Sequence, residues 1–492
     1  MTETVSRGAS SADGWNEPTK NLPPLEVREL PEPLPLGKLI GASVILLATA
    51  LGSGELLIWP YITTQAGVGL LWLATLGFLS QYFLNMEIER YTLATGETAV
   101  TGFSRFWKPW GLVFALGAIL PNAFPGWAAS AATSLTFLTG WGDSTIPWVV
   151  TIILLSIGLA ITVSPVVYNT IERVELVLVV IIVAFLVLAI IVATNLSAWT
   201  GIVTDAPSGV ANLPRYINEI GIATILGAIA FAGAGGANNL CQSNYVRDKG
   251  MGMGVHIPRI VSPITGEEEA RPSTGYSFEI NDENMRRWNG WWKVANREQL
   301  LTFVIIGLGT LIGLSVLVAS VLPEGRSYGD PGSIDFLKEE AIILGERIGV
   351  WFEYFFYIAA FAVLLSTNIG IVDYVSRLTA DSLKTGYLAR SEFWSESKLY
   401  FAAAWIMCIG GAAIIWSGIE PLWLLVIASS GGGVVMFLYS GMLIWLNRRI
   451  LPEPIKIKGA RLVVVALTFA VFAVLSVYLV YWYVNAALTG QL

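Results

Sequence analysis

Charged residues are scarce in this sequence. They make up 13% of its 492 residues, whereas hydrophobic residues make up 54% and the mean hydropathy is +0.64. A soluble protein of this length needs more polar surface than such a composition supplies. We therefore expect an all-α polytopic membrane protein.

Histidine and cysteine are nearly absent as well. His256 is the single histidine, and Cys241 and Cys408 show neither CxxC nor Cys–His spacing, which argues against a disulfide framework or a zinc site. The motifs GxxxxGK[ST] and HExxH do not occur, so we predict no enzyme and no cofactor. A net charge of -7 gives no reason to expect a nucleic-acid partner.

Long apolar runs recur from Lys38 onward. A helix needs about 20 residues to cross roughly 30 Å of hydrocarbon. Residues 1–37 have no such run and are predicted to form a flexible cytoplasmic tail, and residues 38–486 a transmembrane domain. We predict eleven spans, near 39–64, 67–88, 111–138, 146–166, 173–194, 219–246, 299–322, 350–378, 399–417, 421–447 and 462–485.

The basic residues predict an orientation for these spans. Of 29 lysine and arginine residues, the segments on one side of the membrane hold only Arg215, Arg326, Lys338 and Arg347. Cytoplasmic segments carry the excess of basic residues. We therefore place the N-terminus in the cytoplasm and the C-terminus outside, and we expect a multi-pass protein of the plasma membrane.

The longest inside segment, residues 247–297, is predicted to be a cytoplasmic loop insertion. It contains His256, the acidic run Glu267–Glu269 and the tryptophans Trp288, Trp291 and Trp292. A folded loop with an amphipathic, tryptophan-rich helix at the membrane surface fits this composition.

The first span contains the stretch LGSGELLIWPY, from Leu51 to Tyr61. Its glycines and Pro60 weaken a helix, and Glu55 places a carboxylate at the depth of the hydrocarbon. Interrupted backbone is tolerated in a membrane only where it is buried in protein or lines a cavity, as in many transporter sites. We predict a break here that forms half of a binding site.

The sixth span repeats this pattern. Gly233, Gly235 and Gly236 lie mid-membrane and are followed by amide side chains. Two interrupted helices five spans apart are typical of an inverted five-plus-five repeat that holds a substrate between them. Close packing through small residues is the structural alternative for either glycine cluster alone.

Several segments resemble the Nramp family of divalent-metal transporters, which has the LeuT-type fold. They are the first two spans with QAG and ATG, the fifth-span segment IERVELVLVV, the sixth-span segment GAIAFAGAGGANNLCQSNYVR and the eighth-span segment FFYIAAFAVLLSTNIGIVDYVSRLTAD. The resemblance covers most of the chain. It implies an inverted five-plus-five helix repeat plus an eleventh helix, and a secondary transporter of the wider APC superfamily.

The metal-site motifs of that family are replaced in this sequence. Gly52, Ser53, Gly54 and Glu55 stand where Nramp proteins carry Asp-Pro-Gly-Asn, and the segment Gly235–Ala237 stands in place of Met-Pro-His. A thioether ligand helps to select softer transition metals, so its loss argues against Fe²⁺ and Mn²⁺. The third span has no acid, which argues against proton coupling of the family type.

Two substrate hypotheses remain open. In the favoured one, Glu55 and Asn238 are ligands of a hard divalent cation such as Mg²⁺, with backbone carbonyls or bound water completing an oxygen shell. In the alternative, the chain transports a polar organic solute, either a sugar or polyol or an amino acid, with Glu55 as the proton-coupling group of a symporter. The candidate binding residues are Gly52, Ser53, Gly54, Glu55, Trp59, Asn122, Trp127, Gly235, Gly236, Ala237, Asn238, Asn239 and Gln242.

For either substrate, the predicted partners are the lipid bilayer and the small molecule or cation itself. Packing and interfacial anchoring are the structural alternative for the two tryptophans. For Glu55 it is a pairing between helices, although acids inside a membrane are costly and usually functional. We expect a monomer.

Overall fold

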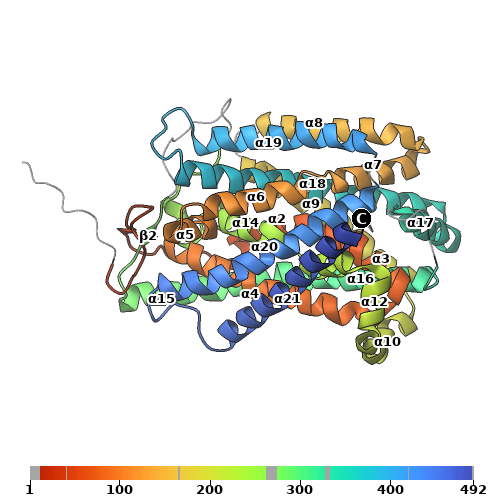
Figure 1. Ribbon diagram of the computed structural model, residues 1–492, viewed down its shortest axis with the longest axis horizontal. Coiled ribbons are helices and arrows are strands. Elements are labelled where there is room, and N and C mark those ends of the chain that lie inside the picture. Colours follow the sequence, from red (N-terminus) through yellow and green to blue (C-terminus); the bar gives the residue numbers. More distant parts are fainter. Residues whose placement is uncertain are drawn as a thin grey trace, which may run out of the picture.

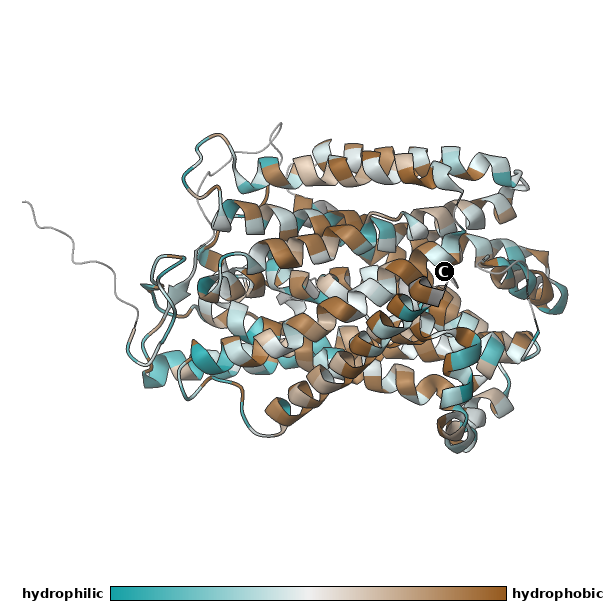
Figure 2. Cartoon of the chain, in the orientation of Figure 1, coloured by the Kyte–Doolittle hydropathy of each residue, from teal (hydrophilic) through white to brown (hydrophobic). Residues whose placement is uncertain are grey.

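The computed structural model describes residues 12–39, 42–163, 167–261, 274–326, 328, 333–418 and 420–489. Most of the long helices run along one axis, which is horizontal in Figure 1. Brown hydrophobic segments fill the middle of that axis and teal hydrophilic segments gather at its two ends (Figure 2). The long axis is therefore the direction that crosses the membrane.

Ten helical segments among the described residues are long and apolar enough to cross a membrane. In chain order, they are built from α2 (Ala42–Ala50), η1 (Leu51–Ile58) and α3 (Trp59–Ala66); η2 (Val68–Leu70) and α4 (Leu71–Thr95); α6 (Trp110–Asn122) and α7 (Gly126–Thr139); η3 (Asp143–Thr145) and α8 (Ile146–Val163); α9 (Val167–Ala193); α15 (Asp282–Gln299), η5 (Leu300–Leu308) and α16 (Gly309–Val321); α18 (Val350–Gly386); α19 (Glu396–Ile414) and η6 (Ile415–Ser417); α20 (Pro421–Arg449); and α21 (Ala460–Thr489).

The sixth predicted span supplies the eleventh crossing. It is divided into α13 (Ile222–Ala230) and α14 (Gly236–Asp248), each too short to cross the membrane alone. The predicted interruption of the sixth span is therefore observed among the described residues, and the total of eleven spans stays a prediction.

The first span lies at the centre of the bundle. Its most apolar window is 94% buried inside the protein, whereas those of α9 and α21 are 28% buried. The first span contacts α18, α16 and α9, and α13 packs against α20. Lipid therefore faces α9 and α21, and the first span is surrounded by protein.

The prediction that the first span is broken at Leu51–Tyr61 is wrong. The chain stays helical from Ala42 to Ala66, and η1 is a π-helical segment in which the amide of Trp59 donates to the carbonyl of Gly54, five residues earlier. This wider turn accommodates Pro60, which follows at the start of α3. Since Pro60 has no amide hydrogen, the carbonyl of Glu55 receives no bond from position 60.

The third span is interrupted instead, which the sequence analysis did not predict. α6 ends at Asn122, and α7 begins at Gly126 after Pro125. The turn between them is closed by a hydrogen bond of 2.9 Å from the amide of Gly126 to the carbonyl of Phe124. Asn122 and Trp127 lie on either side of this interruption.

The N-terminal segment packs on the bundle end that the charge distribution places in the cytoplasm. β1 (Glu26–Val27) pairs in parallel with β2 (Tyr276–Ser277), and α1 (Leu36–Leu39) leads into the bundle. The indole of Trp15 donates to the carbonyl of Phe278 at 2.9 Å. The prediction of a flexible tail over residues 1–37 did not anticipate these contacts of residues 12–37. Residues 1–11 lie outside the described part.

The tryptophan-rich segment of the 247–297 insertion does not form a separate surface helix. It is α15, which continues through η5 and α16 as one helix from Asp282 to Val321. Trp288 and Trp291 are buried, and the Trp291 indole donates to the carbonyl of Pro31 at 2.8 Å. The tryptophans therefore hold the N-terminal segment, and the run Glu267–Glu269 lies outside the described residues.

Short helices complete the two ends of the bundle. α5 (Ala99–Phe106) and η4 (Gly252–His256) lie at the end with β1 and β2. The opposite end, on the right of Figure 1, carries α10 (Leu196–Thr204), α11 (Ala206–Ala211), α12 (Leu213–Ile220) and α17 (Asp335–Ile348).

Candidate functional site

The interruption of the sixth span is built by glycine. Residues 231–235 between α13 and α14 are not helical, and Gly233, Gly235 and Gly236 have φ angles of 111°, 68° and 56°. Side-chain-bearing residues rarely adopt such positive φ angles, whereas glycine does so without steric cost. The glycine cluster seen in the sequence therefore marks a true opening of the backbone, which we call the gap.

Gln81 of α4 satisfies the backbone of the gap. Its amide nitrogen donates to the carbonyls of Ala230 and Ala232 at 2.8 and 2.7 Å. Its oxygen accepts from the amide of Gly235 at 3.0 Å. Unpaired backbone groups inside a membrane cost several kcal/mol, so Gln81 stabilises the gap.

Gln81 is the first member of a row of buried polar side chains on α4 that was not predicted from the sequence. Asn85 and Glu89 follow at four-residue spacing on the same face of α4, and all three are fully buried. The signal was available, because amide and acid side chains at i, i+4 and i+8 on a membrane helix indicate a polar partner on a neighbouring helix.

Two of the predicted binding residues on α14 are partners of this row. Asn239 donates to Asn85 at 2.7 Å and to Gln81 at 3.3 Å, and Gln242 donates to Glu89 at 2.7 Å. These hydrogen bonds hold α14, the second half of the sixth span, against α4. In this conformation, both side chains contribute to the scaffold of the gap.

The first span approaches the gap at Gly54 and Glu55. A Cβ atom placed on Gly54 would lie 1.6 Å from the carbonyl oxygen of Phe231, so the two backbones are in direct contact. The side chain of Glu55 is fully buried, and the backbone amide of Gly233 faces its carboxylate. Neither carboxylate oxygen completes a hydrogen bond of normal geometry with a described residue. The structure thus brings Glu55 to the gap.

The predicted tryptophans lie beside the same gap. The Trp59 indole donates to the carbonyl of Ala228 at 2.9 Å, and the Trp127 ring lies 6.0 Å from the Phe231 ring. Each tryptophan is only 1% exposed. Both are packed against the upper half of the sixth span, so neither presents an open face to a ligand in this conformation.

Asn122 and Asn238 carry buried carbonyl oxygens with no hydrogen-bond donor among the described residues. Their amide nitrogens are used locally, by the carbonyl of Ala118 at 2.8 Å and of Ala234 at 3.5 Å respectively. Asn239 also retains an oxygen with no donor among these residues. Three buried amide side chains, on α6 and α14, therefore keep an acceptor oxygen with no donor among the described residues.

Gly52 and Gly235, two of the positions that the resemblance aligns with metal ligands, leave no space for a side chain. A Cβ at Gly52 would lie 2.2 Å from Thr367 Oγ1, and one at Gly235 would lie 2.7 Å from the Ala230 carbonyl oxygen. The amide of Gly52 donates to Thr367 at 2.9 Å, so Gly52 faces α18. Gly236 packs on Gly432 of α20.

The remaining predicted positions add little to this geometry. Ala237, in the first turn of α14, is 2% exposed. The side chain of Ser53 lies outside the described part of the chain.

A second buried acid faces the first span from α9. Ser366 of α18 donates to the carboxylate of Glu175 and to the carbonyl of Ala48, the latter at 3.2 Å. Glu175 is fully buried. The sequence analysis passed over it within the fifth-span segment IERVE, although an acid in a membrane helix is in itself a signal of function.

Buried ion pairs close the bundle at its predicted cytoplasmic end. Arg247 at the end of α14 binds Asp381 and Glu396 at 3.2 and 2.6 Å. Arg377 of α18 binds Asp373 at 2.8 Å, and it also pairs with Asp248. Both arginine side chains are fully buried, so these ion pairs lie inside the bundle.

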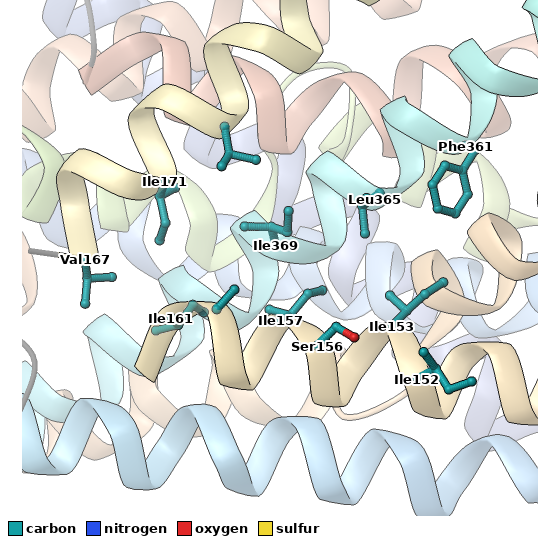
Figure 3. A pocket seen from close by; sticks show the side chains of 12 residues that line it. Ile152, Ile153, Ser156, Ile157, Ile161, Val167, Ile171, Phe361, Leu365 and Ile369 are labelled. Carbon is teal, nitrogen blue, oxygen red and sulfur yellow. The ribbon is translucent and has the colours of Figure 1, made fainter. Parts of the chain in front are cut away.

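One large cavity lies away from the gap. It measures about 310 Å³ between α8, α9 and α18, and Figure 3 shows isoleucine, leucine, valine and phenylalanine side chains pointing into it. Ser156 supplies the only hydroxyl of its lining. Such a lining does not suit a hydrophilic substrate.

A polar cavity opens at the opposite end from the ion pairs. It measures about 280 Å³ and is lined by Ala129 and Thr133 of α7 together with Asp143, Asp335 and Glu420. Thr133 lies six residues along α7 from Trp127, or roughly 9 Å at 1.5 Å per residue. An acidic vestibule therefore lies above the gap.

A multi-span helical bundle with a broken sixth span beside a buried acid is typical of a membrane transporter of the LeuT-type fold. The chain belongs to the Nramp family: the family model described as "Natural resistance-associated macrophage protein-like" matches residues 62–482. It is an Nramp-family secondary transporter and not an enzyme, which confirms the family resemblance and the fold class drawn from the sequence.

Solved structures agree with this assignment. The chain is similar to an Eremococcus coleocola manganese transporter, with a TM-score of 0.67 and 13% identity over 97% of this chain and 92% of that one. It is also similar to Mhp1, a nucleobase-cation-symport-1 family transporter, with a TM-score of 0.51 and 12% identity over 91% and 93% of the two chains. At this identity, the likeness shows the fold alone. No curated protein matches the sequence.

Proposed function

We propose that this transporter moves a hard divalent cation such as Mg²⁺ by alternating access, with the cation bound between η1 and the gap. The observation that carries the proposal is the lone carboxylate of Glu55, fully buried against the gap and without a hydrogen-bond donor of normal geometry among the described residues. Burying a carboxylate whose nearest groups are backbone amides, with no opposite charge, is costly, and a cation offsets that cost.

The ligands that we propose for the cation are hard oxygen atoms. Asn122 and Asn238 offer carbonyl oxygens, and the π-helical turn leaves the carbonyl of Glu55 without a bond from Pro60. Hard oxygen ligands suit Mg²⁺, whereas a sulfur ligand favours softer transition metals. The tight packing at Gly52 and Gly235 supports the loss of the family's usual ligands at those positions.

The number of charged ligands favours a cation that keeps part of its water shell. No group of three His, Cys, Asp or Glu side chains among the residues that the structure describes is placed to hold a metal. One carboxylate offsets half of the charge of a divalent ion. Mg²⁺ sheds water reluctantly, and its bound water molecules donate hydrogen bonds to acceptor oxygens such as those of Asn122, Asn238 and Asn239.

The acidic vestibule supports the same substrate class. Asp143, Asp335 and Glu420 line one cavity at the end opposite the buried ion pairs. Acidic side chains around a cleft raise the local concentration of cations and speed their entry. We infer that the cation enters from this end, which the distribution of basic residues places outside the cell.

The organic-solute alternative gains no support. The aromatic faces expected to bind a sugar, polyol or amino acid belong to Trp59 and Trp127, and both are packed against the gap. Proton coupling through Glu55 belongs to this alternative. It predicts uptake that follows a pH gradient, whereas binding of a cation at Glu55 predicts competition between protons and Mg²⁺.

We further propose that the chain works as a monomer in the plasma membrane, with the N-terminus in the cytoplasm and the C-terminus outside. The concentration of basic residues at one end supports this orientation. The packing of the N-terminal segment against that same end is consistent with it.

Uptake into proteoliposomes tests the substrate. The purified chain is reconstituted, and the entry of Mg²⁺, Mn²⁺, labelled sugars and labelled amino acids is measured in parallel with melting of the detergent-solubilised protein in each solute. A ligand at 100 times its dissociation constant adds about 2.7 kcal/mol of stability. We expect Mg²⁺ entry and Mg²⁺ stabilisation. Uptake of a sugar or an amino acid with no Mg²⁺ entry would overturn the proposal.

A further inference from the structure

A second groove lies on the outer surface of the bundle, between α6, α20 and α21. It measures about 580 Å³ and is lined almost entirely by apolar side chains, with Trp110, Phe437, Trp445 and Phe469 as its aromatic members. α20 and α21 are in contact along this face and are drawn in blue in Figure 1. The groove runs along membrane-spanning helices, so its surroundings are lipid.

The walls of the groove are held by packing within the protein. The Trp445 ring stacks on Phe106 with centroids 4.0 Å apart and an interplanar angle of 17°. Phe437 and Phe469 stack at 5.3 Å and 26°. A Cβ atom on Gly441 would lie 2.8 Å from the Phe469 ring, so the glycine lets α21 approach α20. Contacts within the protein therefore fix the walls of the groove.

Arg448 is the one charged side chain in the lining of the groove. It lies in the last turn of α20, and it makes no hydrogen bond or ion pair with any residue of the described ranges. The nearby acid Glu453 makes its ion pair with Lys456, and Arg448 interacts with Glu453 only through the electrostatic field that helps to lower the pKa of this carboxyl. Lys458 and the neighbouring Arg449 add further positive charge to this end of the chain.

We propose that this groove binds an anionic phospholipid, with an acyl chain along the aromatic walls and the phosphodiester on Arg448. A guanidinium forms paired hydrogen bonds with phosphate oxygens, and basic pockets between helices at the cytoplasmic side of a membrane suit anionic headgroups. Trp110 and Trp445 lie at the same end as Arg448, where tryptophan favours the boundary between headgroups and hydrocarbon.

The charge selects this occupant over other apolar molecules. A sterol or a neutral lipid would fill the hydrocarbon part of the groove and leave the guanidinium without an anion. A second copy of this chain would cover the aromatic walls but would need an acid opposite Arg448. An anionic phospholipid satisfies both the apolar walls and the cation.

Native mass spectrometry of the full-length protein tests the assignment. The purified chain is titrated with phosphatidylglycerol and with phosphatidylcholine of the same acyl chains, and bound lipid is counted. We expect tighter binding of phosphatidylglycerol. Arg448→Gln should weaken that binding about tenfold or more, as expected for the loss of a charge-assisted hydrogen bond, and make the two lipids equal.

Two further variants make the result specific. Arg449→Gln removes the adjacent arginine, which does not line the groove, and should leave phosphatidylglycerol binding unchanged. Leu438→Trp fills the groove and should weaken binding of both lipids while Arg448 stays in place. Equal loss of binding in Arg448→Gln and Arg449→Gln would overturn the site, as would equal affinity of the wild type for the two lipids. A lipid-free dimer that Leu438→Trp dissociates would replace the lipid with a second copy of the chain.

Discussion

Replacing Gly54 with alanine perturbs the contact between the first span and the gap. The added Cβ would lie 1.6 Å from the carbonyl oxygen of Phe231, and such pairs do not approach closer than 3.0 Å. The two backbones must therefore separate by roughly 1.4 Å. Overpacking of a well-packed interior typically costs about 1–3 kcal/mol, and a displacement of about 1 Å in a functional site can cost about 100-fold in rate. We expect Gly54→Ala to lower the melting temperature and to reduce Mg²⁺ uptake by about 100-fold.

The matched control is Gly410→Ala in α19. A Cβ at Gly410 meets no atom within 4 Å, so the substitution adds no clash. Alanine favours a helix over glycine by about 1 kcal/mol, and this variant should therefore melt at or above the wild-type temperature. The melting comparison does not depend on the substrate. If Gly54→Ala melts like the wild type and like Gly410→Ala, the close contact of the first span with Phe231 is not a feature of the protein.

Two further predictions concern the contacts of Gln81 and of His256. Gln81→Leu leaves the Ala230 and Ala232 carbonyls and the Gly235 amide without their hydrogen-bond partner, each at a cost of about 1–3 kcal/mol. This variant should therefore melt well below a Gln65→Leu control. Equal melting temperatures would contradict the role of Gln81. Burial and the nearby Arg28 guanidinium lower the pKa of His256 from its ordinary value of 6.5. Below about pH 6.5 the undocked histidine gains its proton before the docked one does. Docking of the N-terminal segment should therefore weaken as the pH falls through this range. Hydrogen exchange at Tyr276–Ser277, corrected for intrinsic rates, should show this weakening in the wild type and not in His256→Gln.

The opening in the sixth span could be predicted from the sequence because its cause is local. Gly233, Gly235 and Gly236 adopt backbone angles that favour glycine, and a cluster of glycines at membrane depth announces that need before any neighbour is known. The positions of the long apolar helices were predictable for a similar reason, since each depends on the length of one apolar run.

The shape of the first span could not be predicted in the same way. Glycines and a proline are compatible with an unwound segment and with a π-helical turn, and the choice depends on packing against Phe231 and Thr367, which are far away in the sequence. The interruption of the third span was within reach, because Pro121 and Pro125 flank it. The apolar run around these prolines is long enough to be read as one continuous helix, so the interruption was not predicted.

The partners of the candidate residues lay beyond the sequence. Asn239 and Gln242 were predicted from their position after the glycine cluster, but which helix they face depends on the rotation of α14 against α4. Glu55 was predicted because an acid at membrane depth is unusual wherever it lies. Its closeness to Gly233 depends on the fold as a whole.

Uptake of Mg²⁺ by proteoliposomes containing Glu55→Gln tests the central claim most directly. The matched control is Glu353→Gln, which changes an acid in the first turn of α18, away from the gap. We predict that Glu55→Gln folds and melts normally but loses Mg²⁺ uptake, whereas Glu353→Gln transports like the wild type. Wild-type uptake by Glu55→Gln would show that the buried acid does not bind the transported cation.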